Sequence, residues 1–276
     1  MSTSAVVANV AGSVGSASGA SGTMSATIPA ISRWQAIRAI IKRELIAYFD
    51  SPVAYVFLVI FLLLAGVFTF TFGQFFERAE ASLVSFFTWM PWLFLFLVPA
   101  VGMRLWAEER RGGTMELLLT MPVTTWQAIA GKFLASWIFL GIALALTFPF
   151  WVTVNWLGDP DNGIILAGYV GSLLLAGAYL AITSMTSAMT RNQVIAFIVA
   201  VVLCLLLILV GFTPITDLMG RYASARVVET IGTFGVLTHF DGFNRGVLEI
   251  RGVLYFLSII VFALFVTAVL IRNRRR

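Results

Sequence analysis

The chain contains 276 residues, of which 60% are hydrophobic and 11% are charged, and its mean hydropathy is +0.96. Soluble domains carry roughly 25% charged residues, so this composition excludes a soluble protein and indicates an integral membrane protein. The net charge of +5 requires no nucleic-acid partner, because Lys and Arg also orient membrane helices and contact anionic lipid.

The first 32 residues are rich in Ala, Ser, Gly and Val and contain no charged side chain. A signal peptide carries basic residues before its apolar core, and none occurs before Arg33. We therefore predict a disordered N-terminal tail over residues 1–32.

Residues 33–50 have the spacing of an amphipathic helix. Apolar side chains recur at intervals of three or four residues, at Trp34, Ile37, Ile41, Leu45 and Tyr48. We predict that this helix lies on the inner membrane surface, with basic side chains on another face. The alternative is a solvated helix packed against another domain. The residues assigned to this predicted interfacial helix are Trp34, Arg38, Lys42 and Arg43.

Six uncharged runs are each long enough to cross a hydrocarbon core of about 30 Å. They cover residues 51–76, 81–103, 133–158, 162–190, 192–216 and 252–271. The predicted fold is therefore an all-α integral membrane protein with six transmembrane helices. The transmembrane domain is expected over residues 51–272, followed by a basic C-terminal tail over residues 273–276.

The distribution of basic residues predicts the orientation of these helices. If the N-terminus is cytoplasmic, 13 of the 18 Lys and Arg residues lie on the cytoplasmic side. Cytoplasmic loops carry an excess of Lys and Arg, so we predict that both termini are cytoplasmic.

A charged segment, residues 104–124, separates the second run from the third. Its four consecutive charges at 108–111 would each cost roughly 2.5–3.5 kcal/mol at a helix centre, so we place them at or beyond the membrane surface. Thr114 is the predicted N-cap of a short helix that ends at Pro122. This helix is too short to span the membrane and should lie along its surface. The alternative is a loop that serves topology alone.

The turn before the fourth run contains two acids, Asp159 and Asp161. We assign them to turn formation, because six residues supply too few ligands for a calcium site. The fourth run then carries a face of small residues that would allow another helix to approach closely. These residues are Gly168, Gly171, Ser172 and Gly177.

Residues 213–251 form the longest segment on the predicted outer side, with enough apolar side chains to re-enter the membrane. Pro214 is expected to break the fifth helix. His239, Asp241 and Arg245 lie in the second half of the segment. Because His239 is the only histidine, a metal cluster is not supported, and a hydrogen-bonding role is favoured over a catalytic one.

The run ERRGGTMELLLTMPVTTWQAIAGKF, which begins at Glu109, resembles the cytoplasmic segment of type-2 ABC transporter permeases. Members of that family carry the pattern E-x-x-x-G-T-x-E-x-L-L-T-x-P in this segment. The resemblance extends over nearly the whole chain after residue 33. The later run THFDGFNRGVLEIRGVLYFLS resembles the gliding-motility (Gld-type) branch.

In that family the charged segment is the coupling region that meets the nucleotide-binding subunit. The resemblance implies that the helix over residues 33–50 borders the same contact. It also implies a pair of short re-entrant helices within residues 213–251, at the outer mouth of the translocation path. The residues to which we assign ATPase coupling are Glu109, Arg111, Gly113, Thr114, Glu116, Leu118, Leu119 and Pro122.

The energy source must come from a partner. The chain has no G-x-x-x-x-G-K-[ST] phosphate loop and therefore cannot hydrolyse ATP alone. The predicted spans also contain no acidic or basic side chain that could couple transport to protons or sodium.

The leading hypothesis is the permease subunit of an ABC exporter in the bacterial inner membrane. A separate ATPase subunit would bind ATP and Mg²⁺, a second permease chain, identical or related, would complete the pathway, and an auxiliary extracytoplasmic subunit is a further possible partner. No catalytic residue, metal site or cofactor is expected in this chain itself.

Two alternatives come from other classes. A membrane anchor that recruits a machine without moving a substrate fits the gliding-motility resemblance. An enzyme that acts on lipid within the membrane would need convergent polar groups, and the sequence shows no paired Asp motif or nucleophile with a base.

Overall fold

The computed structural model describes residues 33–73, 82–113, 124–221 and 224–273, which belong to one compact unit that begins at Arg33. The tail predicted over residues 1–32 and residues 274–276 of the basic tail lie outside the described residues. Every regular element in the described ranges is helical, so the predicted all-α fold is confirmed.

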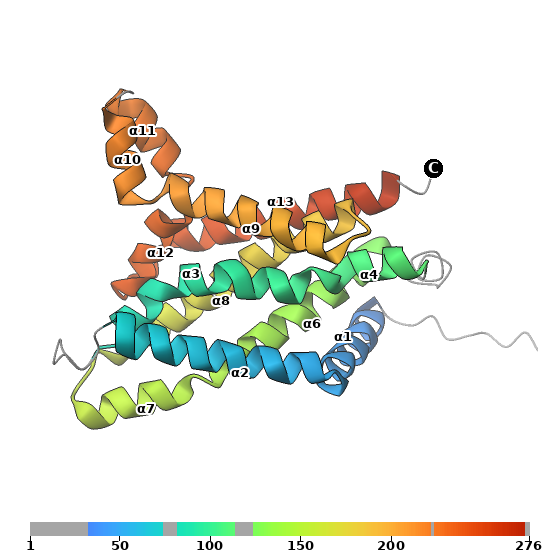
Figure 1. Cartoon of the computed structure of the whole chain (residues 1–276), viewed down its shortest axis with the longest axis horizontal. Helices are drawn as coiled ribbons and strands as arrows, with labels where there is room; N and C mark the ends of the chain where they lie inside the picture. The colour runs from blue at the N-terminus through green and yellow to red at the C-terminus, as the bar shows by residue number, and fades with distance from the viewer. Residues whose placement is uncertain (1–32, 74–81, 114–123, 222–223, 274–276) are drawn as a thin grey trace, which may run out of the picture. The chain divides into compact units, whose positions relative to one another are not determined.

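Figure 1 shows the helices in chain order. They are α1 (Arg33–Asp50), α2 (Pro52–Val67), α3 (Val84–Gly102), α4 (Arg104–Gly112), α6 (Thr125–Ala145), α7 (Phe148–Leu157), α8 (Asn162–Met189), α9 (Gln193–Val210), α10 (Thr213–Gly220), α11 (Ala225–Gly232), α12 (Val236–Asn244) and α13 (Ile250–Asn273). A π-helical turn, Phe68–Phe72, continues α2.

Within the described residues, six helical stretches are long and apolar enough to cross a membrane. They are Pro52–Phe72, Val84–Gly112, Thr125–Leu157, Asn162–Met189, Gln193–Val210 and Ile250–Asn273. This confirms the prediction of six membrane-spanning helices. Two of them contain a break in the helix: α4 continues α3 after a break at Met103, and α7 continues α6 after a break at Leu146 and Thr147.

Three predicted boundaries are wrong. The second helix does not end at residue 103 but continues through the charged residues to Gly112. The third begins at Thr125 rather than at residue 133, because Thr124 and Gln127 form a capping box in which each side chain bonds the other's backbone N–H. The fifth ends at Val210 rather than at residue 216. Pro214 therefore does not break it but lies in the first turn of α10, where its missing N–H costs no helical hydrogen bond.

Helix α8 lies at the centre of the unit and packs against α3, α4, α6, α9, α12 and α13. Its small residues permit this contact, as expected. A Cβ atom at Gly168 would come within 2.5 Å of the Phe87 ring on α3, and one at Gly171 within 2.7 Å of Phe243 on α12. Asp161 caps the start of α8 by accepting a hydrogen bond of 2.8 Å from the Gly163 N–H, which accounts for that acid as a turn residue.

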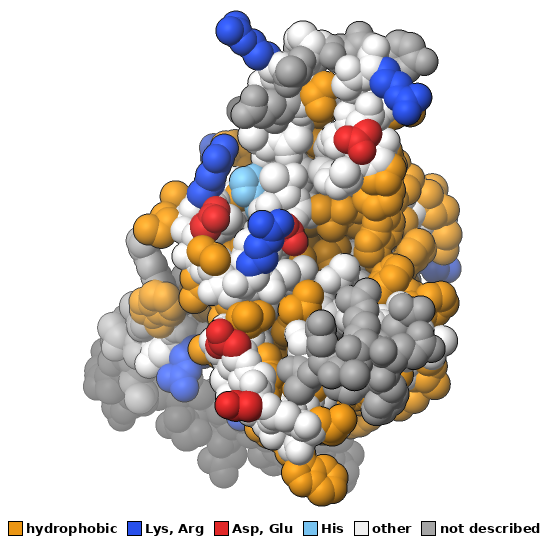
Figure 2. All heavy atoms as spheres, turned by 90° about the vertical axis from the view of Figure 1, so that its left-hand side faces the viewer, with side chains coloured by type: hydrophobic (Ala, Val, Ile, Leu, Met, Phe, Trp, Pro, Cys, Tyr) orange, Lys and Arg blue, Asp and Glu red, His pale blue; other side chains and the backbone are white. Residues whose placement is uncertain are grey.

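Three short helices, rather than a pair, occupy the described part of residues 213–251. Helix α12 packs against α3, α8, α9 and α13 and buries Val236, Phe240 and Phe243. Helices α10 and α11 contact each other, and α10 also contacts α9 (Figure 1). Viewed from this end, in Figure 2, acidic and basic side chains both lie on the surface beside large apolar areas. Re-entry of this segment into the membrane stays a prediction.

Candidate functional site

The charged segment, residues 104–124, begins with α4, whose far end lies at the right-hand side of Figure 1, where α1 also lies. Gly113 terminates α4 with a φ of 70°, a left-handed conformation that glycine adopts without steric cost. The remaining predicted coupling residues, Thr114, Glu116, Leu118, Leu119 and Pro122, lie outside the described residues, and so does the short helix expected there.

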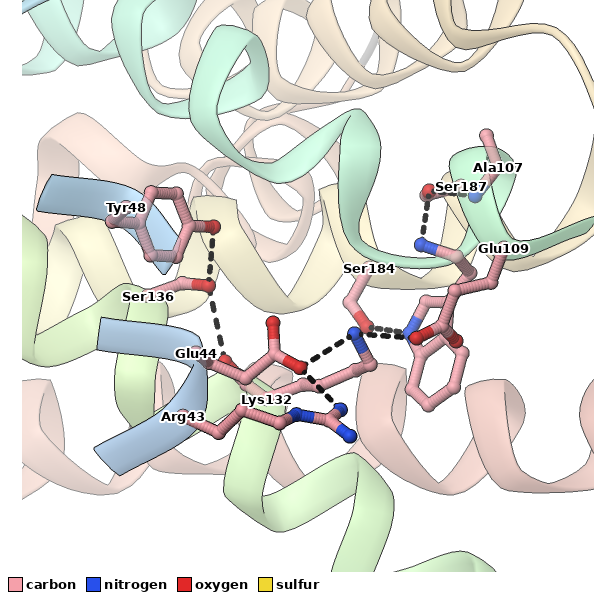
Figure 3. A network of polar contacts seen from close by, with 10 residues as sticks. Arg43, Glu44, Tyr48, Ala107, Glu109, Lys132, Ser136, Ser184 and Ser187 are labelled. Atoms are coloured by element: carbon pink, nitrogen blue, oxygen red, sulfur yellow. Dashed lines mark hydrogen bonds and ion pairs between the residues drawn. The ribbon is translucent and has the colours of Figure 1, made fainter. Parts of the chain in front are cut away.

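Lys132 of α6 is the centre of a charge network that joins three helices. Its Nζ atom lies 2.8 Å from Oε1 of Glu109 on α4 and 3.2 Å from Oε1 of Glu44 on α1. Figure 3 shows the lysine side chain reaching between the two carboxylates. Arg43 adds a second cation, 2.8 Å from the same Glu44 oxygen. We call these four residues the charged joint.

Three of the four side chains in the charged joint are largely removed from water, whereas that of Arg43 is 54% exposed. The side chain of Lys132 is 7% exposed, and those of Glu44 and Glu109 are 17% and 19% exposed. Burial alone would raise the pKa of the Glu44 carboxyl, but Lys132 and Arg43 outweigh burial and hold that pKa below its ordinary value. Two acids face two bases in the joint, and the exposed base, Arg43, balances the second acid.

Hydrogen bonds of Trp106 and Ala107 fix helix α4 to the C-terminal end of α8. The indole Nε1 of Trp106 donates to Oγ of Ser184 over 3.0 Å. The backbone N–H groups of Trp106 and Ala107 both donate to Oγ of Ser187, which in turn donates to the Met103 carbonyl over 2.8 Å. Trp106 itself is buried, and the Lys132 ammonium lies 5.7 Å from its ring.

Helix α1 is fixed to α6 in a similar way. The Tyr48 hydroxyl lies 2.9 Å from Oγ of Ser136, which donates to the Lys132 carbonyl over 3.0 Å. The Tyr48 ring stacks on Phe139, with centroids 5.0 Å apart. Gly131 allows this close approach, since a Cβ atom there would come within 2.6 Å of the Ile40 side chain. Through these contacts α1, α4, α6 and α8 form one packed assembly.

The other residues predicted for this region lie on the surface. Arg111 is exposed at the end of α4, and Arg38 and Lys42 are exposed on α1. Trp34 does not share the half-buried face of Ile37 and Ile41 but is 73% exposed. Of the predicted coupling and interfacial residues within the described ranges, Glu109 and Arg43 are the two that enter the charged joint.

Sequence reasoning identified neither Glu44 nor Lys132 as part of a functional site. Glu44 lies three residues after Ile41, on the apolar face of α1, and an acid at such a position could have indicated a buried partner. Lys132 received no site role from the sequence patterns, yet it lies inside α6, eight positions after the N-cap Thr124. Neither sequence position identifies the other, because the pairing depends on how α1 packs on α6.

The residues predicted for the outer side, His239, Asp241 and Arg245, do not belong to the charged joint. Nε2 of His239 is hydrogen-bonded to the Thr233 carbonyl over 2.8 Å, and the ring stacks on Tyr255 with centroids 4.0 Å apart. Asp241 of α12 forms an ion pair with Arg245, the residue that follows this helix. Among the described residues, no group of three or more His, Cys, Asp or Glu side chains could hold a metal ion.

The fold defines a multi-pass, all-helical membrane protein whose charged joint adjoins the segment that carries the coupling pattern. Residues 80–228, more than half of the chain, match the ABC-2 family transporter protein domain. The chain therefore belongs to the ABC-2 transporter family and is a membrane component of permease type. A comparison with curated proteins finds no significant match. The gliding-motility branch stays a prediction.

Proposed function

We propose that this chain is the permease subunit of an ABC exporter, in which a separate ATPase subunit drives the movement of the membrane helices. Membership of the ABC-2 family implies partnership with an ABC ATPase subunit. The observation that carries the proposal is that the charged joint includes Glu109, the first residue of the coupling pattern.

The joint offers a physical route for the coupling. A displacement of the segment over residues 109–122 acts directly on Glu109 and, through Lys132, on α1 and α6. The hydrogen bonds from Trp106 and Ala107 to Ser187 carry the same displacement to α8, the central helix. Packed helices of this kind move as bodies between discrete arrangements, which is what alternating inward and outward access requires.

The proposed assembly contains two permease chains, identical or related, and two ATPase subunits, with an auxiliary outer subunit as a further possible partner. ATP and Mg²⁺ bind to the ATPase, and this chain binds no cofactor of its own. Both termini, α1 and α4 then face the cytoplasm of a bacterial cell, consistent with the excess of Lys and Arg on that side.

The proposal is tested by purifying the tagged chain from its native membrane in mild detergent and assaying the complex for ATP hydrolysis. A stoichiometric ABC ATPase is expected. The double variant Glu109→Gln/Glu116→Gln should retain less ATPase or lose its ATP-driven transport, whereas Glu249→Gln, the same chemical change at an exposed site before α13, should not.

Two outcomes would overturn the proposal. If no ATPase co-purifies in several mild detergents, the coupling role of residues 104–124 loses its support. If the double variant assembles and exports as the wild type does, the assignment of Glu109 and Glu116 is wrong.

A further inference from the structure

A cavity of about 750 Å³ opens beside the charged joint, between α1, α2, α3, α4 and α6. Its volume lies within the range of sites that hold small molecules. One end is apolar and the other is charged, so the cavity has the polarity of an amphipathic ligand.

The apolar end is lined by exposed side chains of α2. Val53, Val56 and Ile60 line it and are 48%, 56% and 44% exposed, and Leu97 of α3 closes the opposite wall. These residues belong to two of the membrane-spanning helices. A hydrocarbon chain can therefore enter from the bilayer without crossing a polar barrier.

The length of the second span places the charged end at the depth of the lipid headgroups. From Val84 to Met103 the second span runs through helix that carries no charged side chain, and 20 residues at 1.5 Å each cover about 30 Å, the thickness of the hydrocarbon core. Arg104, the next residue, lines the cavity and therefore lies where the phosphate groups of the bilayer are found.

Two opposite charges at this end are available to a ligand. Lys132 is already balanced by Glu44 and Glu109. Arg104 and Glu108 also line the cavity, one helical turn apart on α4, and the side chain of neither forms an ion pair or a hydrogen bond with another described residue. A half-buried guanidinium suits a phosphate, and a carboxylate suits an ammonium group.

We propose that this cavity binds a zwitterionic phospholipid of the surrounding membrane. Its phosphate is held by Arg104, its ammonium group by Glu108, and one acyl chain lies along Val56 and Ile60 of α2. An anionic phospholipid fits less well, because its headgroup offers no cation to Glu108 and meets the carboxylates of Glu44 and Glu109 nearby. The proposal does not depend on the ATPase partner.

Native mass spectrometry of the purified, delipidated full chain in detergent tests the proposal. The probes are dioleoyl phosphatidylethanolamine and dioleoyl phosphatidylglycerol, which have the same acyl chains. The first phosphatidylethanolamine molecule should bind about tenfold more tightly than the first phosphatidylglycerol molecule, the difference expected from one charge-assisted contact.

Three variants locate the site. Arg104→Gln should weaken the binding of the first phosphatidylethanolamine molecule about tenfold. Glu108→Gln should abolish the preference for phosphatidylethanolamine over phosphatidylglycerol. Ile60→Trp, which fills the apolar end of the cavity, should weaken the binding of both lipids. Arg191→Gln is the matched control, because Arg191 is exposed in the turn before α9 and does not line the cavity.

The proposal is overturned if Arg104→Gln binds the first phosphatidylethanolamine as tightly as the wild type does, or if the wild type prefers phosphatidylglycerol. Thermal unfolding of each variant shows whether it is folded. A folded Ile60→Trp variant with unchanged lipid binding would place the lipid outside this cavity, so that result also counts against the proposal.

Discussion

Lys132 and Glu109 come from different membrane-spanning helices, and their charged atoms lie 2.8 Å apart in a place where the lysine side chain is 7% exposed. The same lysine also contacts Glu44 at 3.2 Å. One residue of α6 therefore ties the helix that precedes the spans to the end of the second span. A charge buried in this way is stable only while its partners remain in place.

Replacing Lys132 by Met should destabilise the protein by roughly 2–3 kcal/mol. Removing one partner of a fully buried ion pair costs about 3–5 kcal/mol, and the loss is smaller here because Glu44 and Glu109 are 17% and 19% exposed. Thermal unfolding of the purified chain in detergent measures the change. The triple variant Lys132→Met/Glu44→Gln/Glu109→Gln should regain most of the lost stability, because no buried carboxylate is left without its cation. A triple variant less stable than Lys132→Met would contradict the role of the joint.

Replacing Ser187 by Ala should lower the free energy of unfolding by about 1–3 kcal/mol, because the buried N–H groups of Trp106 and Ala107 then lose their shared acceptor. Ser258→Ala is the matched control, since that exposed hydroxyl bonds only within its own helix, at Tyr255. Its effect should stay within about 0.5 kcal/mol. The measurement is again thermal unfolding, and equal losses in the two variants would show that Ser187 does not anchor α4.

Periodicity and composition predict the helical class and the six spans because length and hydropathy determine whether a segment can cross a membrane. Periodicity and composition do not predict where each helix begins and ends, because local contacts determine those boundaries. Thr124 and Gln127 start the third span eight residues early by capping it, and α4 extends the second span through 108–111, since charged residues remain compatible with a helix once it leaves the hydrocarbon.

The charged joint could not be predicted in full from the sequence. Glu109 was identified through the family pattern, which carries no information about its partner. The contacts of Lys132 with Glu44 and Glu109 arise from the packing of α1 and α4 around α6, which is a tertiary property. The hydrogen bonds from Trp106 and Ala107 to Ser187 likewise depend on the packing of α4 against α8.

Replacing Gly168 by Ala should destabilise the protein by about 1–3 kcal/mol through overpacking, since the added Cβ would come within 2.5 Å of the Phe87 ring. Gly220→Ala is the control, because no atom lies within 4 Å of the corresponding Cβ position. Thermal unfolding should separate the two variants. If both are as stable as the wild type, the contact between α3 and α8 is looser than the structure shows.

The stability contributed by Glu44 should depend on pH. The pKa of its carboxyl lies below the ordinary value of 4.5, so the stabilisation is fully present above pH 4.5 and is lost as the pH falls through the lower pKa of the folded protein. The difference in unfolding temperature between the wild type and Glu44→Gln should therefore be constant near neutral pH and shrink below pH 4.5. Glu249→Gln, the same change at an exposed site before α13, is measured at each pH for comparison. A Glu44→Gln difference that grows on acidification would mean that the folded protein favours the protonated carboxyl, and the ion pair with Lys132 would then not stabilise α1.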